Sequence, residues 1–128
     1  MTFAELVEPL RTAERQGNLD VAVTALTDDS REVKPGSVFV AVKGERVDGH
    51  VFVGKAIEAG AAALVLQKGS QATVAPAMPL VRVDDSRLIL GVLAGRFYRE
   101  PASRLCMVGV TGTNGKTTVT YLCKGVLE

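Results

Sequence analysis

The hydrophobic residues of this chain switch repeatedly between helix-type and strand-type spacing. Runs rich in β-forming residues lie at 21–27, 37–42, 62–66 and 80–83, with polar or glycine-containing turns between them. Helix-type spacing occurs near the N-terminus, over residues 51–59 and from residue 86 onward. This alternation predicts an α/β protein.

The expected helices have start and stop signals of their own. Thr2 and Glu5 have the spacing of a capping box, and Gly17 is expected to end the first helix. Asp84 and Asp85 precede the helix that starts near residue 86, so we interpret them as caps and not as an acid/base pair. The apolar face of that helix is expected to consist of Leu88, Ile89, Val92, Leu93 and Phe97.

Length, charge and cysteine content narrow the classes of function. The 128 residues include 15 Lys+Arg and 14 Asp+Glu, so no general basic patch points to nucleic acid or to an anionic membrane. No stretch approaches the ~20 apolar residues of a membrane span, and the N-terminus lacks a leader pattern. We therefore expect a cytoplasmic location, without membrane insertion and without a nucleic-acid partner. Cys106 and Cys123 lack metal-site spacing and are expected to be buried, reduced thiols.

A glycine-rich loop at residues 109–118 carries the clearest chemical signal. It lies between an expected strand, starting at residues 105–108, and an expected helix over residues 119–126. Glycines let backbone N–H groups curl around a phosphate, and the helix N-terminus adds a positive dipole end. Lys116 would reach the β- and γ-phosphates, and Thr117 can place its hydroxyl on Mg²⁺. The spacing departs from the general phosphate-loop pattern, because Val110 stands where that pattern has glycine.

The loop and several upstream stretches resemble one family. Residues 111–118 read TGTNGKTT, the loop form of the ATP-dependent Mur ligases of peptidoglycan precursor synthesis. The upstream stretches that resemble the N-terminal domain of these ligases are Asp29-Ser30-Arg31, Pro35-Gly36, Phe39-Val40-Ala41-Val42, Gly44, Asp48-Gly49-His50 and Gly60-Ala61. The resemblance implies a small UDP-substrate-binding α/β domain at residues 1–102. The first strand, phosphate loop and helix of a truncated P-loop ATPase-type domain would follow at 103–128.

The resemblance also implies site residues. Those for the UDP part of the substrate are Asp28, Ser30, Glu45, Arg46 and Val47. Those for ATP are Gly112, Thr113, Asn114, Gly115, Lys116, Thr117 and Thr118, with Lys116 as the catalytic residue and Thr117 as the Mg²⁺ ligand. Without the resemblance, residues 28–31 would be read as a turn that hydrogen-bonds itself, and the lone His50 as a helix-start or packing residue.

The implied function is that of an ATP-dependent, amide-bond-forming ligase. It would add meso-diaminopimelate or L-lysine to UDP-N-acetylmuramoyl-L-alanyl-D-glutamate by way of an acyl phosphate, as the MurE-type members of the family do. A MurF-type ligase that adds D-alanyl-D-alanine and a non-catalytic UDP-sugar-binding module remain as alternatives. An unrelated P-loop kinase or GTPase would leave the upstream stretches unexplained.

The short length adds two expectations. The 128 residues alone are expected to have no ligase turnover, because further magnesium ligands, the modified lysine of the family and the amino-acid pocket would be missing. Residues after about 103 are expected to be weakly anchored, because a strand that normally lies inside a parallel sheet would have open edges.

Overall fold

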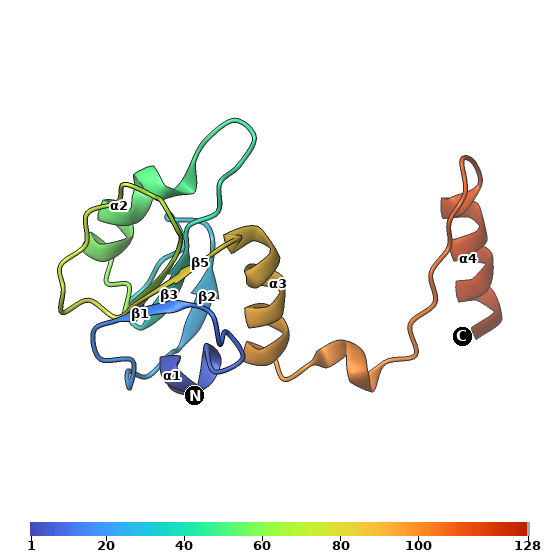
Figure 1. Ribbon diagram of the computed structural model, residues 1–128. Coiled ribbons are helices and arrows are strands. Elements are labelled where there is room, and N and C mark those ends of the chain that lie inside the picture. Colours follow the sequence, from blue (N-terminus) through green and yellow to red (C-terminus); the bar gives the residue numbers. More distant parts are fainter. Residues whose placement is uncertain (128) are drawn as a thin grey trace.

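The computed structural model describes residues 1–127 and contains one five-stranded sheet (Figure 1). The strands are β1 (Glu14–Gln16), β2 (Ala25–Thr27), β3 (Ser37–Val40), β4 (Ala63–Gln67) and β5 (Leu80–Val83), in the order β1-β5-β4-β3-β2. Strands β2 to β5 are parallel, and β1 pairs antiparallel with β5 at one edge. The predicted α/β class is confirmed, with β5 at the expected residues and β2 and β3 shorter than expected.

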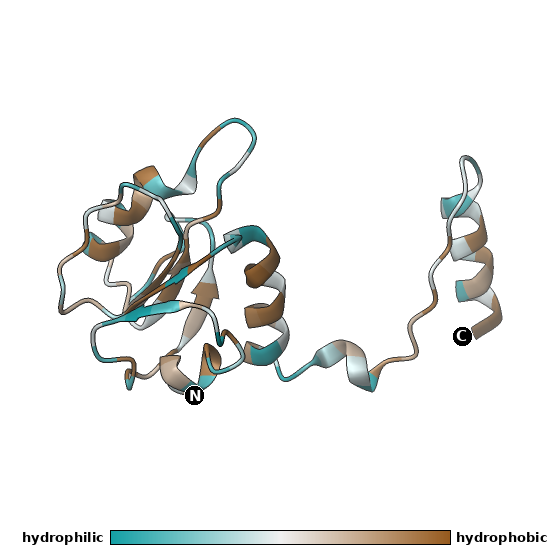
Figure 2. Cartoon of the chain, viewed as in Figure 1, coloured by the Kyte–Doolittle hydropathy of each residue, from teal (hydrophilic) through white to brown (hydrophobic). Residues whose placement is uncertain are grey.

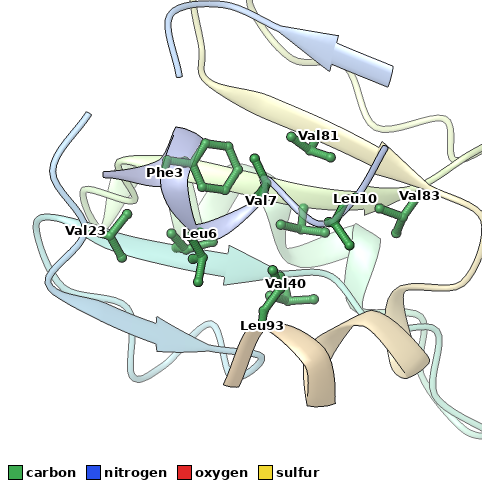
Figure 3. Packing of buried hydrophobic residues seen from close by; sticks show 12 residues of the cluster. Phe3, Leu6, Val7, Leu10, Val23, Val40, Val81, Val83 and Leu93 are labelled. Carbon is green, nitrogen blue, oxygen red and sulfur yellow. The ribbon is translucent and has the colours of Figure 1, made fainter. Parts of the chain in front are cut away.

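Helices and a long loop cover the two faces of this sheet. The helices of the described residues are α1 (Phe3–Leu6), η1 (Gly49–Phe52), α2 (Val53–Glu58), α3 (Ser86–Phe97), η2 (Pro101–Arg104) and α4 (Lys116–Leu127), of which η2 and α4 lie outside the two cores. Helices α1 and α3 pack on one face, and α2 packs on the other together with residues of the 68–79 loop. Figure 3 shows the first of these two cores, in which Phe3, Leu6 and Leu93 meet Val40 and Val81 of the sheet.

Strand β3 lies at the centre of both cores. Val38 and Val40 face the α1/α3 side, and Phe39 faces the α2 side, and all three are fully buried. A parallel strand covered on both faces needs apolar residues at successive positions, which is the continuous run that the sequence has here.

The N-terminal segment differs from its prediction. The capping box of Thr2 and Glu5 is confirmed, but α1 ends at Leu6, before Pro9. The chain then forms β1 ahead of Gly17, so the expectation that Gly17 ends the helix is wrong. Pro9 cannot donate an intrahelical hydrogen bond, which favours an early end. The three polar residues of β1, drawn as a hydrophilic edge strand in Figure 2, give no alternating pattern to detect.

The buried face of α3 is also shifted from its prediction. Asp85 caps the helix as expected, accepting hydrogen bonds from the amides of Arg87 and Leu88 at 2.9 and 3.1 Å. Leu88 and Val92, however, are exposed. The residues that pack on the sheet are Ile89, Leu90, Leu93 and Phe97. The buried stripe is thus rotated by about one position from the predicted one, toward the side that faces the sheet.

The C-terminal segment leaves the sheet after α3. Arg99 and Glu100 have positive φ, and η2 follows. No strand forms at residues 105–108, so this part of the predicted fold is corrected: a strand requires a partner backbone, and no strand of residues 1–127 pairs with this stretch. Helix α4 stands away from the sheet in Figure 1, and its side chains are exposed.

Cys106 and Cys123 are exposed free thiols, so the prediction of burial was wrong. Among the described helices, none has the length and hydropathy to cross a bilayer.

Candidate functional site

A cleft of about 810 Å³ lies at the carboxyl ends of β2 and β3. Its lining comes from the loop after β2, the loop after β3, the helices η1 and α2, and the first turn of α3. The residues are Asp28, Asp29, Ser30, Arg31, Val42, Gly44, Val47, Gly49, Phe52, Lys55 and Arg87. In open sheets of parallel strands, ligands bind outside the carboxyl ends of the strands, where several loops converge. The position of this cleft is therefore that of a ligand site.

The loop after β2 is a self-bonded turn that nevertheless faces the cleft. The Asp29 carboxylate accepts a hydrogen bond from the Arg31 amide at 2.9 Å and two from Arg31 Nε at 2.9 and 3.1 Å. Thr27 Oγ1 accepts from the Asp29 amide at 3.1 Å. Among residues 1–127, the side chains of Asp28 and Ser30 make no hydrogen bond, so both are available to a ligand. The turn reading and the ligand reading of residues 28–31 are thus compatible.

The hydrogen bonds between Asp29 and Arg31 give this turn a testable pH dependence. Hydrogen bonds from the Arg31 side chain and amide lower the pKa of Asp29 from 3.8 to about 2. A carboxylate with a depressed pKa stabilises the folded turn at pH values above its pKa in the unfolded chain. That contribution is lost as the pH falls through its pKa in the folded chain. We expect the Asp29 carboxyl carbon to titrate in NMR near pH 2, and the same carbon in Arg31→Ala to titrate nearer to 3.8. Equal midpoints in the two proteins would show that the pair does not hold the turn.

The loop after β3 folds into a short hairpin along the cleft wall. The Gly44 amide donates to Val47 O at 3.0 Å, the Gly49 amide donates to Val42 O at 2.9 Å, and Lys43 and Asp48 pair as a bridge. A Cβ at Gly44 would lie 2.7 Å from Val47 O, and one at Gly49 would lie 2.7 Å from Val42 O. Both positions therefore require glycine for the close approach of the two sides.

The hairpin separates the predicted substrate residues into two groups. Val47 lines the cleft together with Asp28 and Ser30. Glu45 and Arg46 lie at the exposed tip of the hairpin and do not line the cleft. Three of the five predicted residues are thus brought together around one hollow.

Two cations of the cleft were missed in the sequence. Lys55 lies in α2, with its Nζ 5.6 Å from the centre of the Phe52 ring, and Arg87 donates from Nη2 to Lys43 O at 3.4 Å. Within residues 1–127, neither forms an ion pair. The signal that could have found Arg87 was its place two residues after the Asp85 cap, since the first turn of a helix after a parallel strand lies at the ligand edge.

The charges of the cleft favour an anionic ligand. Arg31 is neutralised by Asp29, so the cleft charges that have no ion-pair partner among residues 1–127 are Lys55, Arg87 and Asp28. Their sum is positive. Phe52, Val42 and Val47 add an apolar surface next to these cations. A ligand with a phosphate group and a flat ring would match both parts.

The glycine loop forms a second, separate candidate site. Gly112 and Gly115 have φ of +152° and +79°, a region that disfavours other residues. Helix α4 begins at Lys116, and its first backbone hydrogen bond is donated by the Val119 amide to Gly115 O. The amides of residues 116–118 therefore precede the first intrahelical bond, as at the N-terminus of any helix. Lys116 Nζ donates to Gly112 O within the loop. Amides, an ammonium and the Thr117 hydroxyl are a donor set that fits the phosphates of ATP.

The described residues hold no dedicated metal cage. No group of three or more His, Cys, Asp or Glu side chains that could hold a metal ion occurs within residues 1–127. Magnesium in this part of the chain would be shared between the Thr117 hydroxyl and phosphate oxygens, which is how Mg²⁺ usually binds with nucleotides.

Comparisons with known proteins all lead to one family of enzymes. A model described as "Mur ligase family, catalytic domain" matches residues 22–98, which include all of the cleft residues and stop before the glycine loop. The chain is 40% identical over 132 residues to the "UDP-N-acetylmuramoyl-L-alanyl-D-glutamate--2,6-diaminopimelate ligase" of Syntrophomonas wolfei, covering 100% of the chain and 26% of that protein. The protein of the same name from Geobacillus thermodenitrificans is 48% identical over 112 residues, covering 88% of the chain and 22% of that protein.

Solved structures agree on the fold. The UDP-N-acetylmuramoylalanyl-D-glutamyl-2,6-diaminopimelate--D-alanyl-D-alanyl ligase of Acinetobacter baumannii superposes with a TM-score of 0.70 at 26% identity, covering 98% of the chain and 27% of that structure. MurF ligase from Thermotoga maritima, solved in complex with ADP, has a TM-score of 0.54 at 36% identity, covering 75% of the chain and 21% of that structure. The chain thus spans about a quarter of the length of the proteins it matches.

Proposed function

This chain belongs to the Mur ligase family, and from that premise we propose that it is the N-terminal part of a MurE-type, ATP-dependent ligase. The whole enzyme would add 2,6-diaminopimelate to UDP-N-acetylmuramoyl-L-alanyl-D-glutamate, the reaction named for the relatives at 40% and 48% identity. The second candidate is a MurF-type ligase, which the structural matches to MurF favour. Either function belongs to peptidoglycan synthesis in the cytoplasm.

Residues 1–102 hold the UDP end of the substrate in this proposal. The single observation that carries it is the cleft at the carboxyl ends of β2 and β3. There Asp28, Ser30 and Val47 lie beside two cations that form no ion pair with any described residue. Asp28 and Ser30 offer polar groups to uracil or ribose, while Lys55 and Arg87 face the diphosphate. Glu45 and Arg46 flank the site from the tip of the hairpin.

Residues 103–128 supply the start of the ATP site. Gly112, Thr113, Asn114, Gly115 and Thr118 contribute the loop backbone and polar groups. Lys116 binds the phosphates and offsets their charge, and Thr117 binds Mg²⁺. ATP, when bound, supplies the activation of the substrate carboxylate as an acyl phosphate, because carboxylates resist direct attack by amines.

The test is a calorimetric titration of the 128-residue chain with UDP, with uridine and with UDP-N-acetylmuramoyl-L-alanyl-D-glutamate. We expect saturable binding of UDP and of the full substrate, with uridine clearly weaker. We also expect no release of ADP when ATP, substrate and diaminopimelate are added together. Failure of both UDP ligands to bind would refute the proposed site, and ADP release that depends on both substrates would refute the inactivity of the chain by itself.

A further inference from the structure

His50 makes two hydrogen bonds that join different parts of the fold. Its Nε2 accepts from the Gln67 amide at 2.9 Å, at the carboxyl end of β4. Its Nδ1 contacts the Asp48 carboxylate, which also accepts from the His50 amide at 3.0 Å and caps η1. The side chain of His50 is only 8% exposed, whereas that of Asp48 is 45% exposed. The ring is thus held between the sheet and the loop after β3.

These two contacts fix the tautomer of the ring. A backbone amide can only donate, so Nε2 accepts and carries no proton in this arrangement. The proton of the neutral ring is therefore on Nδ1, where it is donated to Asp48. The hydrogen bonds from the His50 amide and from the His50 ring, in that order of size, lower the pKa of Asp48, which keeps this acceptor charged.

The segment held by His50 is the hairpin of residues 43–48. Asp48 pairs with Lys43 across the hairpin, and the next residue, Gly49, donates to Val42 O. Val42, Gly44, Val47 and Gly49 all line the cleft, while His50 itself does not. A change at the ring would therefore reach the cleft through the hairpin and through η1, whose Gly49 and Phe52 line it.

We propose that His50 is a positioning residue for the nucleotide cleft, because its ring ties the hairpin of residues 43–48 to the end of β4. That the cleft binds a nucleotide rests on the proposed function, whereas the link between the hairpin and β4 does not. The ring sets the distance of the hairpin from the sheet and so the position of Val47 and of the Gly49 amide. A role in proton transfer to a ligand is not part of the proposal, since Nε2 is occupied by a backbone amide and His50 does not line the cleft.

The tautomer can be read directly, because the chain contains a single histidine. Long-range ¹H–¹⁵N NMR at neutral pH should show a protonated Nδ1 and an unprotonated Nε2. A protonated Nε2, or the averaged pattern of a freely exchanging ring, would overturn the proposal without any variant.

The variants are His50→Ala and His50→Gln, with Gln71→Ala as the control. Glutamine can present an acceptor near the position of Nε2, so it retains the bond from Gln67. Gln71 lines a separate hollow, which His50 also lines, and does not line the cleft. In His50→Ala we expect the rate of amide hydrogen exchange at Gly44 and Gly49 to rise about tenfold, because a charge-assisted hydrogen bond is lost. We expect the Kd for UDP to rise by a similar factor. His50→Gln should recover most of both effects.

The Leu64 amide separates positioning from general stability. It donates to Pro79 O at the start of the β4–β5 pair, and Leu64 is fully buried, so its exchange reports the opening of the core. We expect it to stay within twofold in His50→Gln and in Gln71→Ala. Unchanged exchange at Gly44 and Gly49 in His50→Ala, or an equal rise at Leu64 in His50→Gln, would overturn the proposal. If the unaltered chain binds no UDP, the proposed function fails, and the exchange data still decide the role of His50.

Discussion

Replacing Leu64 by alanine should lower the free energy of unfolding by about 2–5 kcal/mol, whereas Leu122→Ala should change it by less than about 0.5 kcal/mol. The two substitutions remove the same atoms. Leu64 is fully buried on β4, among Phe39, Leu66 and Leu80, and its loss leaves a cavity that a close-packed sheet cannot fill. Leu122 on α4 is 65% exposed, so its truncation leaves no cavity.

The measurement is urea unfolding followed by far-UV circular dichroism, with both variants at the same protein concentration. The pair tests the proposed division at residue 102, because it asks whether the cooperative unit includes α4. A loss for Leu122→Ala as large as that for Leu64→Ala would place α4 inside the core and contradict the division.

The strands could be predicted where a continuous apolar run dictates burial on both faces. The continuous apolar runs at 38–42 and 61–66 contain the parallel strands β3 and β4, while the run that became β5 is interrupted by Arg82. The edge strand β1 could not be found in this way, since its side chains are exposed or half-buried and its pairing with β5 is long-range. The face of α3 was missed for a related reason: apolar spacing permits two neighbouring stripes, and only the position of the sheet decides between them.

The candidate site was predicted in part. The loop of residues 28–31 and Val47 could be named from resemblance, and the structure brings them to one cleft. Lys55 could not, because an isolated cation on a helix is ordinarily solvated and only the sheet order places α2 at this edge. For Arg87 the sequence offered only its place two residues after the Asp85 cap. At residues 105–108 a strand was expected but did not form. Its residues favour a strand, but a strand requires neighbours, which local sequence does not provide.

Replacing Arg87 by methionine should raise the Kd for UDP by about 10- to 100-fold, the range expected for losing hydrogen bonds from a charged donor. Arg87 is the cation of the cleft that comes from α3, and among residues 1–127 it has no carboxylate partner. Methionine keeps the length of the side chain and most of its packing. The folded state should therefore change little, since the one side-chain hydrogen bond of Arg87 to a described residue is the 3.4 Å bond to Lys43 O.

Arg104→Met is the matched control, because it removes the same charge from an exposed residue outside the cleft. Any effect of net charge on UDP is equal in the two variants, so the difference between them belongs to the cleft. Uridine supplies the second comparison. If Arg87 binds the diphosphate, Arg87→Met should weaken UDP but leave the weak binding of uridine unchanged, and the preference for UDP should shrink by the same 10- to 100-fold. An equal loss for both ligands would place Arg87 against the nucleoside, and equal affinities of the two methionine variants for UDP would remove it from the site.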